Sequence, residues 1–160
     1  MNLANPIGMP LTRRLLSGKV STDAMWTDAP VINCPFCELI AEDSDSRIVQ
    51  ENEHAVAIRD AYPVSPGHTL IIPKRHEGSF FALSSAEQQS VMELLNSQHQ
   101  RLQAKYQFTD CNVGINDGSS AGQTVPHCHL HLIPRARGDV DDPRGGVRWI
   151  IPSKADYWTR

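Results

Sequence analysis

Three histidines at alternate positions form the group in this chain most suited to chemistry. His127, His129 and His131 account for three of its seven histidines. Strict alternation predicts a β-strand, in which successive side chains point to opposite faces. Neighbouring imidazoles would then lie about 6.6 Å apart on one face, and the outer two about 13 Å apart. The intervening apolar side chains would point into a core: Cys128, Leu130 and Leu132.

Imidazole suits nucleophilic attack at neutral pH, because its ordinary pKa near 6.5 leaves much of it unprotonated. A central histidine can attack phosphorus while a neighbour supplies charge or a hydrogen bond to the phosphoryl oxygens. Gln123 and Thr124, just upstream, offer neutral donors to the same oxygens. No acidic cluster suited to Mg²⁺ lies beside them, which favours covalent catalysis. Zinc hydrolases also use H-x-H spacing, so a mononuclear zinc hydrolase with His127 and His129 as ligands stays open as an alternative.

A C-x-x-C pair at Cys34 and Cys37 is a second chemical group. In a reducing compartment such a pair either binds metal or is redox-active. The strand and βαβ context of a thioredoxin-like motif is absent here, so the metal interpretation is favoured. Cys111 and Cys128 are expected to pack as small apolar groups.

The elements that must position these groups follow from periodicity and turn residues. The pattern predicts strands at 48–50, 55–58, 68–73 and 111–116, besides the histidine strand. Ser84 and Glu87 match a capping box at the start of a long helix, 85–106, and a short helical turn follows the C-x-x-C. The glycine-rich loop 117–122 lets backbone amides approach a ligand. One main helix with strands at hairpin spacing predicts an α+β domain around a largely antiparallel sheet.

Composition excludes several classes of protein. The chain has 160 residues, 40% hydrophobic and 21% charged, which fits one globular domain. A net charge near -3 argues against binding along a nucleic-acid polymer. No apolar run approaches the roughly 20 residues that span a bilayer, and no secretory signal is evident, so we expect a cytoplasmic protein without a membrane partner.

The two ends differ from the middle of the chain. Residues 1–30 predict an N-terminal arm, residues 31–138 the domain, and residues 139–160 a C-terminal tail. The tail mixes arginines and aspartates with Trp149, Tyr157 and Trp158. Because exposed tryptophans are unfavourable, we expect the tail to dock on the domain or on a dimer partner.

The segment from Gly122 to Pro134 resembles the signature of the histidine triad (HIT) nucleotide-binding proteins. The resemblance continues through residues 66–76 and Asn116, and covers roughly residues 34–137. It implies a HIT-like fold: a mainly antiparallel five-stranded sheet with one long and one short helix, extended across a homodimer.

The resemblance also implies roles at a site that transfers AMP from a purine nucleotide. His129 would be the nucleophile that forms a nucleotidyl-histidine, His131 would contact the phosphates, and His127 would orient the nucleophile with help from His68. Gln123 and Thr124 would hold phosphate oxygens or the leaving group, and Asn116 would lie beside them. Asp60 would bind the ribose hydroxyls. For Asp60, an aspartate capping the turn before Pro63 is the alternative.

Some bacterial members of that family carry a structural zinc, and the resemblance assigns its ligands here to Cys34, Cys37, His76 and His127. Two thiolates and two imidazoles suit tetrahedral Zn²⁺. The expected function is a nucleotide hydrolase that releases AMP from phosphoramidates, adenylates or dinucleoside polyphosphates. A non-catalytic nucleotide sensor is the other alternative.

Overall fold

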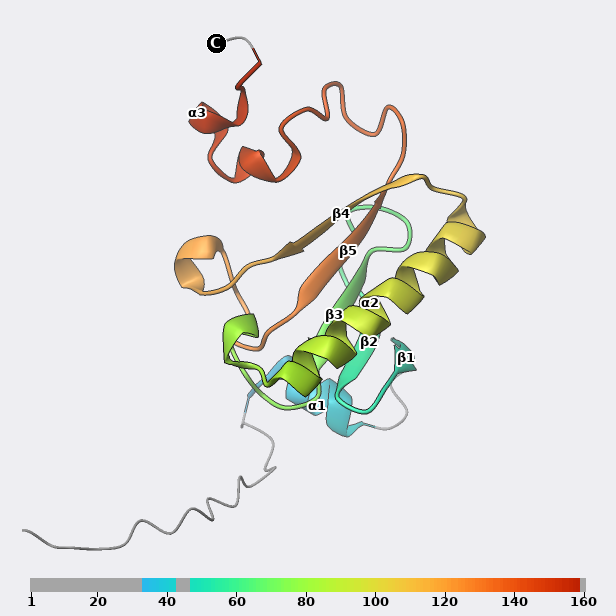
Figure 1. Cartoon of the computed structure of the whole chain (residues 1–160), viewed down its shortest axis with the longest axis vertical. Coiled ribbons are helices and arrows are strands. Elements are labelled where there is room, and N and C mark those ends of the chain that lie inside the picture. Colours follow the sequence, from blue (N-terminus) through green and yellow to red (C-terminus); the bar gives the residue numbers. More distant parts are fainter. Residues whose placement is uncertain (1–32, 43–46, 159–160) are drawn as a thin grey trace, which may run out of the picture.

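A computed structural model describes residues 33–42 and 47–158, so the expected N-terminal arm lies outside the described residues. Its centre is one five-stranded antiparallel sheet in the order β1-β2-β3-β5-β4 (Figure 1). The strands are β1 (Ile48–Glu51), β2 (Ala55–Arg59), β3 (Thr69–Pro73), β4 (Asp110–Ile115) and β5 (Leu130–Arg135). The predicted α+β class and antiparallel sheet are confirmed.

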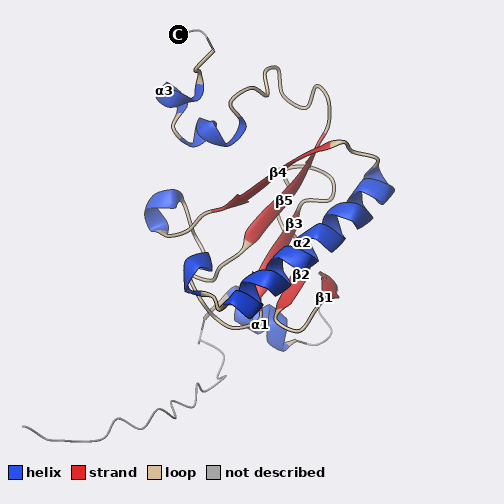
Figure 2. Cartoon of the chain, in the orientation of Figure 1, coloured by secondary structure: helices blue, strands red, loops and turns tan. Residues whose placement is uncertain are grey.

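The sheet separates two apolar clusters, and Figure 2 shows the helices that lie over it. Alternate side chains along a strand point to opposite faces of the sheet. β2 and β3 are buried almost throughout, so both faces of the sheet are covered at these strands. One face, with Ala57, Ile71 and Leu132, packs against α2 (Ser85–Tyr106). The other face, with Ile58 and Leu70, packs against α1 (Pro35–Ala41). His131 pairs with Leu70 across β3 and β5, which places it on the α1 face.

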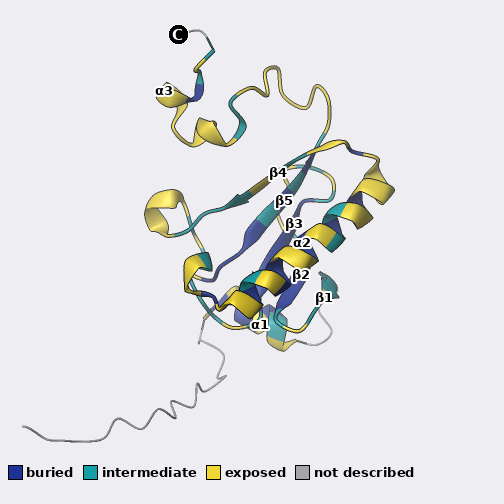
Figure 3. Ribbon diagram, in the orientation of Figure 1, coloured by how far each residue is buried: buried dark blue, intermediate teal, exposed yellow. Residues whose placement is uncertain are grey.

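The long helix α2 has the predicted bounds, and its capping box is complete. The Ser84 side chain accepts from the Glu87 amide, and the Glu87 carboxylate accepts from the Ser84 amide. Arg75 donates to the same carboxylate at 2.7 Å and holds the pKa of Glu87 down at about 2. The apolar side chains at helical spacing are buried: Val91, Leu94, Leu95 and Leu102. Figure 3 shows this buried stripe beneath an exposed outer face.

The histidine strand is shorter than predicted. β5 begins at Leu130, so His127 lies in a bend and only His131 of the triad is on the strand. Pro126 has no amide hydrogen for a ladder, and the amides after it bond elsewhere: His127 donates to Val125 O and Cys128 to Glu77 O. The expectation that Cys128, Leu130 and Leu132 enter the core is confirmed.

The remaining elements are short. Three 3-10 turns, Phe80–Ala82, Ser119–Ala121 and Gly146–Ile150, and a small helix α3 (Pro152–Ala155) complete the described chain. In the C-terminal tail the Arg144 guanidinium lies 4.5 Å from the Trp158 ring, and Trp149 donates to Arg144 O at 2.8 Å. The tail thus packs largely on itself, beside β4. Among the described residues no helix has both the length and the apolar content to span a membrane.

Candidate active site and metal cluster

His129 is held in an orientation that suits a nucleophile. Its Nδ1 lies 2.7 Å from the carbonyl oxygen of His127. A carbonyl only accepts, so Nδ1 carries the proton and Nε2 keeps its lone pair. The side chain is only 6% exposed, and the Phe36 ring stands edge-on to it at 5.2 Å. The backbone and α1 therefore fix which nitrogen of His129 can react.

His131 forms a hydrogen-bonded chain with two predicted site residues. Its Nδ1 lies 3.0 Å from Nε2 of His68, and the other nitrogen of His68 lies 3.5 Å from a carboxylate oxygen of Asp60. The His131 ring also stands 5.2 Å from that of His129. Burial and the neighbouring imidazoles lower the pKa of His131 to about 4, and burial lowers that of His68 despite the Asp60 charge. The structure thus places His68 against His131, and the predicted help of His68 in orienting the nucleophile remains a prediction.

His127 faces the cysteines. Its Nδ1 lies 3.4 Å from the Cys34 sulfur and 3.5 Å from the Cys37 sulfur, and His76 Nδ1 lies 3.2 Å from the Cys37 sulfur. One ligand atom from each of these four residues falls within 4.8 Å of the others. His127 Nε2 bonds to Pro73 O at 2.9 Å, so its proton is on Nε2 and its lone pair on Nδ1. Burial lowers the pKa of His127 to about 4, which keeps that lone pair available.

A Cys₂His₂ set with one imidazole already oriented by a backbone carbonyl fits tetrahedral Zn²⁺. Cys34 occupies the N-cap position of α1, and Pro35 begins that helix. The cluster therefore connects α1 to the bend that precedes β5. All four predicted metal ligands meet at one point.

Three glycines near the triad have open space beside their backbone. Gly114 pairs with His131 across β4 and β5, and an added Cβ there would meet nothing within 4 Å. Gly118 and Gly122, both at positive φ, have equally open surroundings. Thr124 is exposed and Asn116, directly after β4, is half-buried. Open space therefore lies beside Gly114, Gly118 and Gly122.

Gln123 connects two loops. Its side-chain oxygen accepts from the Gly118 amide at 2.8 Å, and its amide donates to Gly78 O at 2.8 Å. The geometry therefore shows a loop-bridging role for Gln123, and its contact with phosphate remains a prediction. Phe36 and the Pro73 carbonyl were not predicted as site groups. Only the position of Phe36 between the two cysteines hinted at the former.

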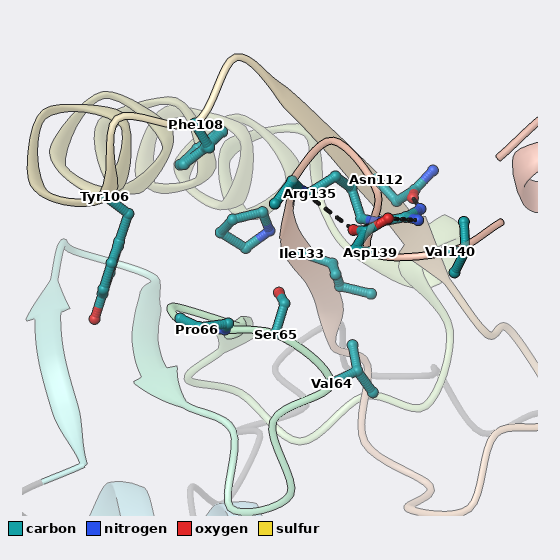
Figure 4. Close-up of a pocket in the computed structure, with 12 residues that line it drawn as sticks. Val64, Ser65, Pro66, Tyr106, Phe108, Asn112, Ile133, Arg135, Asp139 and Val140 are labelled. Atoms are coloured by element: carbon teal, nitrogen blue, oxygen red, sulfur yellow. Dashed lines mark hydrogen bonds and ion pairs between the residues drawn. The ribbon is translucent and has the colours of Figure 1, made fainter. Parts of the chain in front are cut away.

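A hollow of about 570 Å³ lies beside Ile133 and Arg135 of β5 (Figure 4). It is lined by apolar side chains from three regions, with the Arg135–Asp139 ion pair at its rim: Val64, Pro66, Tyr106, Phe108, Ile133 and Val140. Its described lining contains no histidine. The Val64–Pro66 loop forms one wall, and the same loop bonds His68 through Val64 N–H and Ser65 O. The hollow thus adjoins the support of His68 rather than the nucleophile.

Comparison with known proteins agrees with the triad geometry. A model of the HIT domain matches residues 41–138, more than half of the chain. The chain belongs to the HIT family. A crystal structure of a HIT family protein from Bacillus anthracis is 37% identical to this HIT protein, with a TM-score of 0.63 over 68% of this chain and 77% of that one.

The similar proteins include both uncharacterised and named members. An uncharacterized 16.1 kDa HIT-like protein of Mycoplasma pneumoniae is 39% identical over 103 residues, 64% of this chain and 72% of its own. A Saccharomyces cerevisiae protein named bis(5'-adenosyl)-triphosphatase is 32% identical over 114 residues, 70% of this chain. This HIT protein spans only about half, 52%, of that longer relative.

Proposed function

We propose that this HIT protein is a nucleotide hydrolase that releases AMP through a covalent intermediate on His129. The observation that carries the proposal is the His129 Nδ1 bond to the His127 carbonyl, which leaves a lone pair on Nε2. The yeast relative named bis(5'-adenosyl)-triphosphatase supports a phosphorus-centred hydrolysis. Candidate substrates are adenosine phosphoramidates, adenylates and dinucleoside polyphosphates, because all share the AMP half.

The chemistry proceeds in two displacements at one phosphorus atom. In the first, the Nε2 lone pair of His129 forms an N–P bond while the P–N or P–O bond to the leaving group breaks, and the leaving group takes up a proton. In the second, water attacks phosphorus and the N–P bond breaks. AMP then leaves, and His129 is neutral again. His131 contacts the phosphoryl oxygens in both steps.

Asp60, Asn116, Gln123 and Thr124 complete the proposed nucleotide site. The Asp60 side chain is 15% exposed and sits beside the His68–His131 pair, where a ribose next to the α-phosphate would lie. Asn116 and Thr124 flank the glycine-rich loop in the sequence, one on each side of it. Preference for a purine base is carried over from the family resemblance.

A structural Zn²⁺ on Cys34, Cys37, His76 and His127 is part of the proposal. Four protein ligands would close its coordination sphere, so the ion would fasten α1 to the bend before β5 and leave the reaction to other groups. Because His127 faces the thiols, the geometry favours this role over a mononuclear zinc hydrolase that uses His127 and His129.

A homodimer is likewise proposed. β4 forms one edge of the sheet, and its Val113 is 43% exposed. Open edges pair readily with another strand. The tail that follows the domain also has exposed apolar side chains, and a second copy of the chain would cover them: Val147, Trp149, Ile150 and Ile151.

The test of the mechanism is substitution of His129 by alanine. Loss of a covalent nucleophile is expected to lower kcat by about a thousandfold or more. A His54→Ala variant is the matched control, because His54 lies on the turn between β1 and β2. Mass spectrometry of quenched wild-type enzyme should show an AMP adduct that His129→Ala lacks. Turnover above about a tenth of wild type in His129→Ala would rule out the covalent mechanism.

If wild-type protein bound AMP but turned over none of the three substrate classes, the non-catalytic sensor would replace the hydrolase.

A further inference from the structure

The nucleophile of the proposed function lies outside the ladder of the sheet. β5 begins at Leu130, and the register with both neighbouring strands also begins there, so His129 has no ladder pair. The hydrogen bond of its Nδ1 goes to the carbonyl oxygen of His127, only two residues away. That bond sets the tautomer of His129, but it moves with the bend that contains both residues. The orientation of the ring relative to the rest of the domain therefore depends on other contacts.

Phe36 joins the His129 ring to a different element of the fold. The two ring centroids lie 5.2 Å apart and the ring planes meet at 69°, which is a favourable edge-on arrangement. Phe36 stands in the same way against the His127 ring, at 5.9 Å and 75°. The other ring contact of His129 within the described chain is with His131, two residues further along the same segment. Phe36 thus supplies the ring contact between His129 and α1.

The Phe36 ring is itself held from two directions. Cys34 and Cys37 flank Phe36 in the chain, and their sulfurs lie 3.4 and 3.5 Å from Nδ1 of His127. The ring also packs against the buried apolar cluster on the α1 face of the sheet. Because the turn and the cluster fix Phe36, its ring is a firm support for the plane of the His129 imidazole.

We propose that Phe36 is a positioning residue for the nucleophile, which holds the His129 ring so that Nε2 points at phosphorus. This inference rests on the proposed function and adds to it a residue of α1. The attacking atom must lie about 3–3.5 Å from its target with its lone pair aligned, so rotation of the ring lowers the rate. Loss of one edge-on aromatic contact corresponds to a kcat about three- to tenfold lower.

A positioning role separates kcat from KM. Phe36 is half-buried, so part of its ring is accessible to a bound nucleotide. A residue that only contacts the nucleotide raises KM when it is replaced, whereas one that aligns the nucleophile lowers kcat. Replacement of Phe36 by a side chain without a ring should therefore lower kcat and leave KM within about twofold of wild type.

The kinetic test measures hydrolysis of an adenosine phosphoramidate by wild type, Phe36→Leu and Phe108→Leu. Leucine keeps an apolar side chain in place and removes the flat ring, and Phe36→Met is a second variant without the ring. Phe108→Leu is the matched control, because Phe108 stands edge-on to His99 at 5.4 Å and 84° and belongs to the cluster on the opposite, α2 face.

We expect kcat to fall about three- to tenfold in both Phe36 variants and to stay within about twofold of wild type in Phe108→Leu. An unchanged kcat in the Phe36 variants, or a raised KM alone, overturns the inference. An equal loss of kcat in Phe108→Leu also overturns it, because the effect would then follow from any lost aromatic contact.

The second test reads the His129 ring without catalysis. ¹³C relaxation of the full-length protein, labelled in its histidine rings, reports the mobility of each imidazole, and His129→Ala identifies the signal by its absence. The His129 ring should be more mobile in Phe36→Leu and as rigid as wild type in Phe108→Leu. Unchanged mobility in Phe36→Leu overturns the inference and leaves the proposed function intact. If wild type released AMP from none of the substrates, the proposed function would fail, and this measurement alone would decide whether Phe36 orients His129.

Discussion

Acid should destabilise this protein through His131, and the size of the effect follows from the burial of that ring. The folded state holds the pKa of His131 at about 4 because burial and the nearby imidazoles disfavour its charge. In the unfolded chain the pKa returns to about 6.5. Between these values the unfolded state binds more protons, so stability is lost as pH falls from about 6.5 toward 4.

The two pKa values set the magnitude. The part of this pKa difference that titrates between about pH 7 and about pH 4.5 corresponds to roughly 2 kcal/mol of unfolding free energy before solvent screening is considered. Because the His131 ring is only partly buried, solvent screening reduces this to about 1 kcal/mol. The loss should be complete near the folded pKa and absent above about pH 7.

The assay is urea unfolding of wild type and His131→Asn at the two pH values. Subtracting the variant's pH dependence from that of wild type removes the contribution of every other titrating group. We expect wild type to lose about 1 kcal/mol more than His131→Asn on acidification. The control His54→Asn replaces a half-buried histidine on the turn between β1 and β2 and should behave as wild type. Equal acid losses in wild type and His131→Asn would refute the argument that His131 is held neutral by burial.

Three further predictions concern the supports of the site. Cys37→Ser should lower the zinc content of purified protein, measured by plasma mass spectrometry, well below the value for wild type. Wild-type protein with less than a few tenths of a zinc per chain would contradict the proposed metal cluster. Ser84→Ala should cost about 1 kcal/mol of unfolding free energy in urea, because the Glu87 amide loses its cap, while kcat stays within about twofold. Gly67→Ala should destabilise by about 1–2 kcal/mol and also lower kcat. The reason is that Gly67 has a φ of +90° and an added Cβ would come within 2.9 Å of the Tyr106 ring. A variant with wild-type stability would show that the loop before His68 tolerates a side chain.

The parts of the fold that local signals determine were predictable from the sequence. The helix Ser85–Tyr106 carries its own capping box and a sustained apolar spacing, so both its limits matched the structure. The antiparallel class followed from short strands separated by turn residues. The histidine strand was predicted too long, because alternation alone did not show that Pro126 and the Glu77 carbonyl divert the backbone before Leu130.

The partners within the site depend on contacts between distant segments. His68 meets His131 because Leu70 pairs with His131 across β3 and β5, a register that spacing along the chain does not reveal. The Phe36 contact with His129 arises where α1 crosses the sheet face. The metal cluster was anticipated by the family resemblance, since residue types alone offered several ways to complete a C-x-x-C site.

The imidazole ring and the backbone carbonyl of His127 contact two different groups of residues. Its ring faces the cysteines, and its backbone oxygen accepts a hydrogen bond from His129 Nδ1–H. A ring can be exchanged by mutation, but every amino acid has the same carbonyl. A descendant of this protein could therefore lose the proposed metal ligand at position 127 and still hold the proton of the proposed nucleophile, His129, on Nδ1. Metal binding and catalysis can thus diverge independently in evolution, although both pass through a single residue.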